Sequence, residues 1–152
     1  MPKQVIEKHF RESIVNNSDV VTIEKIQVNQ HAHTSTDADF FFQTEKLDYK
    51  VECKQVTLSR KRPNFNLSRF TQEFKLSKWD KALSRNRGFL FLVFWGSSKK
   101  SSHAFFIPIE AWLRFREQFP NMKSFDRYKA FELFCPYIVE TASNHKFWQF
   151  DL

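Results

Sequence analysis

The segment Gly88–Trp95 (Gly-Phe-Leu-Phe-Leu-Val-Phe-Trp) is apolar at every position after its glycine. Successive side chains of a strand point to opposite faces of a sheet, so a continuous apolar run predicts a strand that is buried on both faces. Strands of this kind occur in sheets that carry helices on both sides. The segment therefore predicts a strand at the centre of the fold.

The chain around this segment alternates between helical and extended patterns. Apolar residues at helical spacing predict helices over residues 3–16, 67–86 and from Pro108 onward. Runs rich in β-branched or aromatic residues predict strands over residues 20–28, 39–42, 48–56 and 103–107. The basic segment 57–66 is expected to be an exposed loop. Residues 118–152 form an aromatic extension that is expected to cover a sheet face or to make a dimer surface.

Composition restricts the class of protein. The chain has 152 residues, of which 41% are hydrophobic, which is enough for one domain with a substantial core. Two cysteines do not make a disulfide framework, and no stretch approaches the roughly 20 apolar residues of a membrane span. The first residues lack the apolar core of a signal peptide. We therefore expect a single domain over residues 1–152, in the cytoplasm and without a membrane partner.

Positive charge is concentrated in the middle of the chain. Residues 54–87 contain ten Lys or Arg and two acids, a local charge of +8 against +7 for the whole protein. An ordinary solvated helix face intersperses the two signs, so this one-signed segment favours phosphate binding. DNA is the expected partner. The residues expected to contact it are Arg60, Lys61, Arg62, Arg69, Lys75 and Lys78.

Three charged side chains lie on a predicted hairpin, residues 39–56. Asp39 begins its first strand, and Glu52 and Lys54 stand two residues apart in its second. Because strand side chains alternate, Glu52 and Lys54 share a face. Carboxylate oxygens are preferred Mg²⁺ ligands, and the backbone carbonyl of Cys53 can add another oxygen. A lysine beside them can orient an attacking water or stabilise developing charge, so the stretch predicts a metal site for phosphodiester chemistry.

Other polar groups admit two interpretations. Glu7 flanks the apolar stripe of the first predicted helix, so it can lean over the sheet or remain a solvated surface carboxylate. His31 and His33 can ligate a metal together with a nearby aspartate, Asp37 or Asp39. No third nitrogen or sulfur ligand stands near them, which favours surface or phosphate-contacting histidines.

The acid and the acid–x–lysine triplet, with their spacing, resemble a known motif. Asp39 followed by Glu52-Cys53-Lys54 is similar to the motif of the PD-(D/E)xK nucleases, with Ala38 where that superfamily often has proline. The predicted order of helix, strand, hairpin, helix and strand is similar to its restriction-endonuclease-like αβββαβ core. The resemblance implies an α/β fold in which a central mixed sheet is flanked by helices. Within the superfamily, the chain resembles the RecU-type Holliday-junction resolvases. The segments that carry this likeness are residues 35–40, 51–54, 88–93 and 108–113.

The resemblance carries expectations for individual residues. It implies that Asp39 and Glu52 are metal ligands, with Mg²⁺ as the cofactor and Mn²⁺ as a substitute. It implies that Lys54 is the catalytic lysine. Glu7 takes the position of the acid on the first helix, a possible further metal ligand, and Gln72 that of a glutamine that supports the site. A homodimer is expected, because resolving a four-way junction needs two symmetric incisions.

The resemblance covers about residues 5–117 and leaves alternatives open. The connection between Val28 and Thr34 is shorter than the stalk that RecU-type enzymes insert into a junction, and the residues after Met122 have no counterpart in them. A restriction- or repair-type endonuclease on the same core is therefore one alternative. A DNA-binding module without activity is another. An RNA-binding protein is a third, although the chain shows no RNP-like aromatic–glycine signature.

Overall fold

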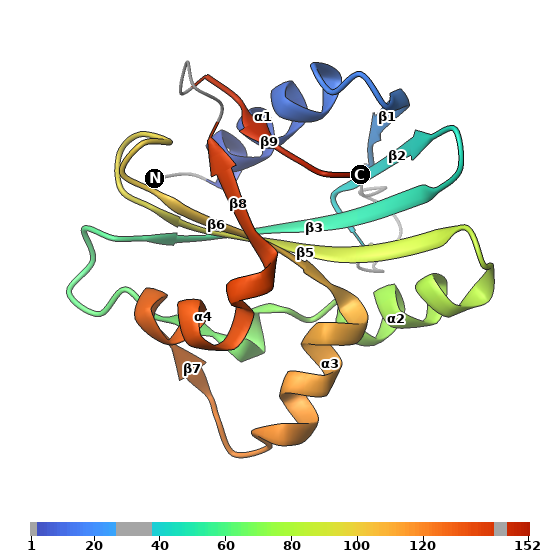
Figure 1. The fold of residues 1–152 in the computed structure, drawn as a ribbon. Helices are drawn as coiled ribbons and strands as arrows, with labels where there is room; N and C mark the ends of the chain where they lie inside the picture. Colours follow the sequence, from blue (N-terminus) through green and yellow to red (C-terminus); the bar gives the residue numbers. More distant parts are fainter. Residues whose placement is uncertain (1–2, 27–37, 142–145) are drawn as a thin grey trace, which may run out of the picture.

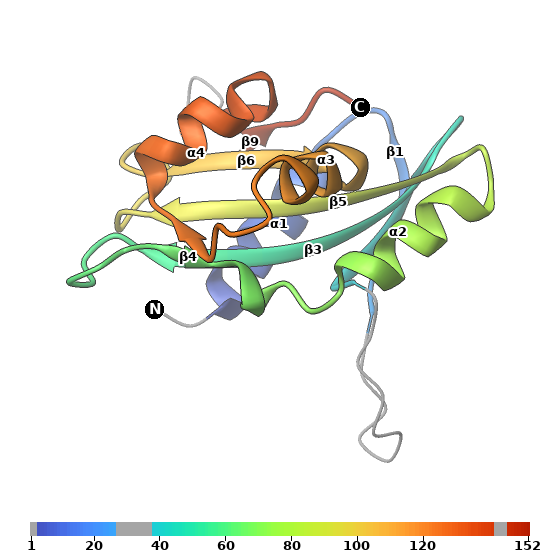
Figure 2. The same ribbon diagram turned by 90° about the horizontal axis from the view of Figure 1, so that it is seen from below.

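The computed structural model describes residues 3–26, 38–141 and 146–152, which form a mixed α/β fold with helices on both faces of a central sheet (Figure 1 and Figure 2). The expected fold class is confirmed. The described helices are α1 (Lys3–Val15), α2 (Glu73–Ala82), α3 (Ile109–Gln118) and α4 (Arg127–Phe134), with 3₁₀ turns at Leu67–Arg69 and Cys135–Tyr137. No helix within these ranges is long and apolar enough to cross a membrane.

The strands of the described ranges form a seven-stranded sheet, in the order β1-β2-β3-β5-β6-β8-β9, and a two-stranded ribbon of β4 and β7. The first three strands make an antiparallel meander, whereas β3 and β5 run parallel. Parallel neighbours need a crossover connection, which α2 supplies. The strands are β1 (Val20–Lys25), β2 (Phe40–Thr44), β3 (Asp48–Thr57), β4 (Phe65–Asn66), β5 (Asn86–Trp95), β6 (His103–Pro108), β7 (Ser124–Phe125), β8 (Ile138–Thr141) and β9 (Trp148–Gln149).

A hydrophobic cluster fills each face of the sheet. On one face, Ile6, Phe10 and Ile14 of α1 pack on β2, β3 and β5. On the other face, α2, α3 and α4 pack around Trp112, which is fully buried. Figure 1 shows this division, with α1 above the sheet and the other three helices below it. The apolar run of β5 contributes side chains to both clusters, as its sequence predicts.

Two predicted boundaries are wrong. The expected helix over residues 67–86 is divided into the 3₁₀ turn and the shorter α2, and Phe70 is buried between these two pieces. The expected loop 57–66 ends in β4. This strand pairs with β7, which provides hydrogen-bond partners for the backbone of β4. Of the expected strand 20–28, Val20–Lys25 form β1, and residues 27 and 28 lie outside the described residues. In the two wrong cases a contact with a distant part of the chain outweighs local propensity.

Gly88 marks a close approach of α2 to β5. A Cβ atom at this position would lie 2.8 Å from the Cγ atom of Leu76 and 3.2 Å from the carbonyl oxygen of Leu76. Gly88→Ala is therefore expected to lower the free energy of unfolding by about 1–3 kcal/mol, because the new methyl group overpacks a filled contact. Chemical denaturation measures this loss.

Leu76→Ala, alone and combined with Gly88→Ala, tests the cause of that loss. Shortening Leu76 makes room for the added methyl group, so the double variant should lose less stability than the sum of the two single losses. Strictly additive losses would show that the contact with Leu76 is not responsible.

The end of the aromatic extension lies on the α1 face, one of its two expected positions. The backbone N–H of Trp148 donates to the Ser13 hydroxyl at 3.0 Å. The ammonium of Lys99 lies 2.9 Å from Nδ1 of His9 and 5.6 Å from the centroid of the Trp148 ring. Burial, and then the charge of Lys99, lowers the pKa of His9, so a neutral imidazole suits this contact. Residues 146–152 thereby help to hold α1 on the sheet.

Candidate active site

Asp39 lies immediately before β2 and is held beside Glu52. The backbone N–H of Asp39 donates to the carbonyl of Val51 at 3.0 Å. Its Oδ2 atom accepts a hydrogen bond from the backbone N–H of Cys53 at 2.9 Å. These two bonds attach Asp39 to the residues on either side of Glu52 in β3. One backbone bond and one bond of the Asp39 side chain therefore hold Asp39 against the strand that carries Glu52.

Glu52 and Lys54 share the face of β3 that looks toward α2 and α3. Val51 and Cys53, at the alternate positions, belong to the cluster under α1, so the two charged side chains point the other way. Glu52 is 1% exposed, and its Oε1 atom lies 3.5 Å from Nζ of Lys54. A tight charge-assisted hydrogen bond spans roughly 2.8 Å. The two charged groups therefore attract each other at a separation longer than that of a tight ion pair.

Lys50 continues this row of charged side chains, and the sequence interpretation missed it. Its ammonium lies 4.9 Å from the centroid of the Trp79 ring on α2. The Trp79 ring also meets Phe41 edge to face, with 6.4 Å between their centroids. The period of two residues along a strand puts Lys50 on the same face as Glu52 and Lys54. That alternation was the signal that could have identified it.

Glu7 belongs to α1, on the opposite face of the sheet from Lys54. Its Oε2 atom lies 2.9 Å from Nζ of Lys25. Lys25 pairs with Phe40, whose ring is part of the cluster under α1. Among the residues that the structure describes, no three His, Cys, Asp or Glu side chains form a group that could hold a metal ion, so Glu7 does not complete one with Asp39 and Glu52. Its role as a ligand stays a prediction.

Gln72 occupies the N-cap position of α2. Its backbone carbonyl accepts the N–H of Leu76 at 2.9 Å, the first bond of the helix. Its side-chain Oε1 atom is buried and has no hydrogen-bond partner within the described ranges. Leaving a buried acceptor in this state costs roughly 1–3 kcal/mol. The supporting role expected of Gln72 stays a prediction.

The cations expected to contact DNA extend from the end of β3 to α2. Arg69 is partly buried and donates from Nη1 to the carbonyl of Gln55 at 2.9 Å, one residue beyond Lys54. Burial has the largest effect on the pKa of Arg69 and lowers it. The positive charge of Arg60 lowers this pKa further, so Arg60 lies near Arg69. The remaining members of the set are exposed: Lys61 and Arg62 in the loop after β3, and Lys75 and Lys78 on α2.

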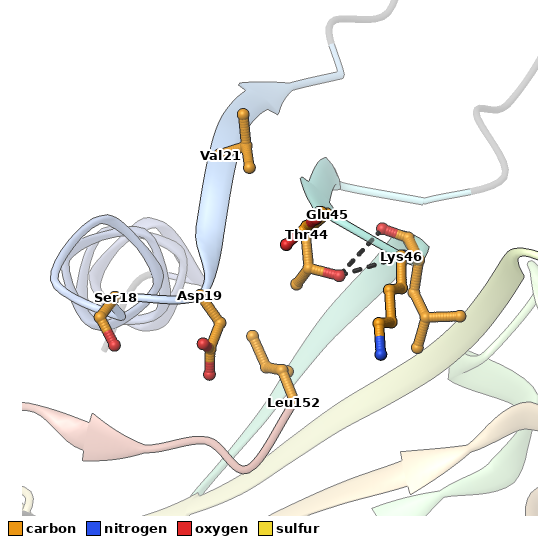
Figure 3. Close-up of a pocket in the computed structure, with 8 residues that line it drawn as sticks. Ser18, Asp19, Val21, Thr44, Glu45, Lys46 and Leu152 are labelled. Carbon is orange, nitrogen blue, oxygen red and sulfur yellow. Dashed lines mark hydrogen bonds between the residues drawn. The ribbon is translucent and has the colours of Figure 1, made fainter.

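A separate hollow lies at the far end of β2. Figure 3 shows it between the α1–β1 connection, the β2–β3 turn and the C-terminal residue. The Thr44 hydroxyl stabilises this turn by accepting the N–H of Leu47 at 3.1 Å. β2 separates Thr44 from Asp39 by roughly 16 Å, so the hollow is not part of the candidate site. The residues that line it are Ser18, Asp19, Val21, Thr44, Glu45, Lys46, Leu47 and Leu152.

The alternative metal site of His31, His33 and Asp37 lies outside the described residues. A comparison of the sequence with protein-family models finds no match, and no curated protein is significantly similar to the chain. The structure itself brings Asp39 beside Glu52 and places Lys54 on the same face as Glu52.

Proposed function

We propose that the protein is a metal-dependent endodeoxyribonuclease that cleaves branched DNA, and that its substrate is a four-way (Holliday) junction. One observation carries the proposal. Asp39 is bonded to the residues on both sides of Glu52, and the Glu52 carboxylate lies 3.5 Å from the Lys54 ammonium. Two carboxylates beside a lysine, on a face with further cations, suit a divalent metal ion next to a phosphodiester.

The architecture supports the PD-(D/E)xK type. The elements follow the order α1, β1, β2, β3, α2 and β5, with the acid–x–lysine triplet on β3, the second strand of a hairpin. β3 runs parallel to β5 through the α2 crossover. This is the arrangement that the resemblance implies for a restriction-endonuclease-like core. It also puts Gln72 at the start of the helix that follows the hairpin.

The donor set suits Mg²⁺. Asp39 and Glu52 offer hard carboxylate oxygens, and the carbonyl of Cys53 lies between Glu52 and Lys54 in sequence. When bound, the ion would neutralise phosphate charge and lower the pKa of a water molecule. Lys54 would orient the attacking water, or stabilise the charge that develops on the phosphoryl oxygens. Arg69 and Arg60 would hold the flanking phosphates as permanent cations.

A substrate panel tests the proposal. The purified protein is incubated with a synthetic four-way junction, a linear duplex or single-stranded DNA, each with Mg²⁺ or with EDTA. We expect paired symmetric nicks in the junction with Mg²⁺ and none with EDTA, because the paired incisions come from two sites of a dimer. Sedimentation measures whether the protein is dimeric.

Two other results would redirect the assignment. Cleavage of the linear duplex at the same rate would favour a restriction- or repair-type endonuclease. Binding without cleavage under every metal condition would contradict the enzymatic proposal and favour a DNA-binding module.

A further inference from the structure

α2 presents mainly positive charge to solvent, because Glu73 is buried and Asp80 is partly buried and hydrogen-bonded to the backbone. The Glu73 carboxylate is 6% exposed and accepts a hydrogen bond from Nε1 of Trp112 at 2.7 Å. Asp80 accepts the backbone N–H of Gly88 at 2.7 Å, and burial raises the pKa of Asp80. The charged side chains of α2 that remain exposed are Lys75, Lys78 and Lys81.

Phe74 lies in the first turn of the same helix and is 72% exposed. Phe74 is one of the apolar residues of the expected helix 67–86, but Leu76 and Ser77 fill the buried side of α2. Lys78 and Lys81 follow Phe74 by four and seven residues, so the three side chains share one helix face. The Phe74 ring is therefore exposed to solvent beside two ammonium groups, although burying a phenylalanine side chain is normally favourable.

A hydrogen bond links the segment that precedes Phe74 to the strand of the candidate active site. Arg69 is bonded to the carbonyl of Gln55, one residue after Lys54. The five residues from Arg69 to Phe74 span at most about 18 Å, and less here because the segment includes a 3₁₀ turn and the start of α2. A DNA strand whose phosphodiester lies at Lys54 can thus reach Phe74 within a few nucleotides.

We propose that Phe74 is a base-stacking residue that holds an unpaired base of the substrate strand. This inference rests on the proposed DNA substrate and names its local form, a strand with unstacked bases beside the cleavage point. The cationic face suits an anionic partner, and the exposed ring suits a planar apolar surface. Single-stranded DNA offers both, whereas a duplex keeps its base faces stacked inside.

Binding measurements in EDTA, where no metal-dependent cleavage can occur, test the inference. Fluorescence anisotropy follows the full chain with three labelled probes of equal length: oligo(dT), an abasic oligonucleotide with the same number of phosphates, and a blunt duplex. Phe74→Ala is expected to weaken oligo(dT) binding by roughly 5- to 150-fold, the range that stacking on one aromatic side chain spans. Binding of the abasic oligonucleotide and the duplex should be unchanged, because neither offers a free base.

Three further variants separate stacking from other effects. Phe74→Trp should keep or raise oligo(dT) affinity, while Phe74→Leu should lose it, because leucine is apolar but has no ring. Leu83→Ala is the matched control, since Leu83 is also exposed, at 60%, at the other end of α2. Leu83→Ala should bind all three probes as the wild type does. Lys78→Ala should weaken all three alike, because it removes a phosphate contact.

Several outcomes would overturn the inference. One is that the wild-type protein does not bind oligo(dT). Another is that Phe74→Ala loses the same affinity for all three probes. A third is that Phe74→Leu binds oligo(dT) as the wild type does. A change of sedimentation coefficient in Phe74→Ala without a change in DNA binding would show that Phe74 contacts a second protein copy instead. The proposed function is tested separately: it is contradicted if the wild-type protein shows no Mg²⁺-dependent cleavage of the junction.

Discussion

Glu52→Gln is expected to reduce metal-dependent DNA cleavage by at least about 100-fold while the protein stays folded. Removing one group that stabilises charge in a transition state typically costs about 100- to 1,000-fold in rate. Glutamine has nearly the shape of glutamate but lacks the charge that holds a divalent ion. Because glutamine is neutral, it also needs no positive charge beside it at this position, where the residue is 1% exposed. Single-turnover cleavage of the junction with Mg²⁺ measures the rate, and circular dichroism checks the fold.

Glu45→Gln is the matched control for this substitution. Glu45 is an exposed acid in the turn of the same hairpin, so its neutralisation should leave the cleavage rate unchanged. Full activity in Glu52→Gln, or an equal loss in Glu45→Gln, would contradict the assignment of Glu52.

Lys54→Met extends the same experiment to the lysine. We expect cleavage to be lost while junction affinity in EDTA stays nearly unchanged, because Lys54 is assigned to the chemistry and not to binding. An equal loss of affinity would instead make Lys54 a phosphate anchor. The variant also removes the ammonium that lies 3.5 Å from a buried carboxylate, which can cost up to about 3–5 kcal/mol of stability. Combining it with Glu52→Gln should restore part of that loss.

Trp112→Ala is expected to lower the free energy of unfolding by about 3–5 kcal/mol, the usual cost of truncating a buried aromatic residue. The Trp112 ring is fully buried at the centre of the cluster under α2, α3 and α4, and it stacks on Phe134 with 5.9 Å between the ring centroids. Its indole N–H also donates to the buried carboxylate of Glu73. The alanine variant removes both interactions, and chemical denaturation measures the loss.

Trp112→Phe separates the hydrogen bond from the packing. It keeps most of the ring volume but removes the donor to Glu73, so we expect a loss of about 1.5–3 kcal/mol. Tyr128→Ala is the control, because Tyr128 is an exposed aromatic of α4 whose removal should change stability by less than about 0.5 kcal/mol. A Trp112→Phe variant as stable as the wild type would show that the Glu73 carboxylate does not depend on the indole.

Local patterns were sufficient to predict the elements that carry the candidate site. The apolar run of β5 has no polar position, so it required burial on both faces, and the structure gives it to both clusters. The alternation of β3 placed Glu52 and Lys54 on one face without any knowledge of the neighbouring strands. These predictions succeeded because side-chain direction in a strand depends on the backbone alone.

Predictions that needed distant contacts were less successful. The charged and apolar residues of 67–86 follow a helical period, but burial of Phe70 and the pairing of β4 with β7 shorten the helix. The helical period alone does not indicate which row of side chains faces the sheet. Leu76 packs against Gly88, and this contact turns Phe74 outward to solvent.

By itself, the sequence determined that Asp39, Glu52 and Lys54 belong to one hairpin, because strand alternation and turn position are local properties. Only the tertiary structure decided what surrounds them. It attached Asp39 to the backbone on both sides of Glu52, and it placed α1, with Glu7, over the opposite face of the sheet. It also buried Glu73 and bonded the partly buried Asp80 to the backbone of Gly88, which leaves α2 with a mainly cationic surface, because burial and hydrogen bonding depend on partners outside the helix.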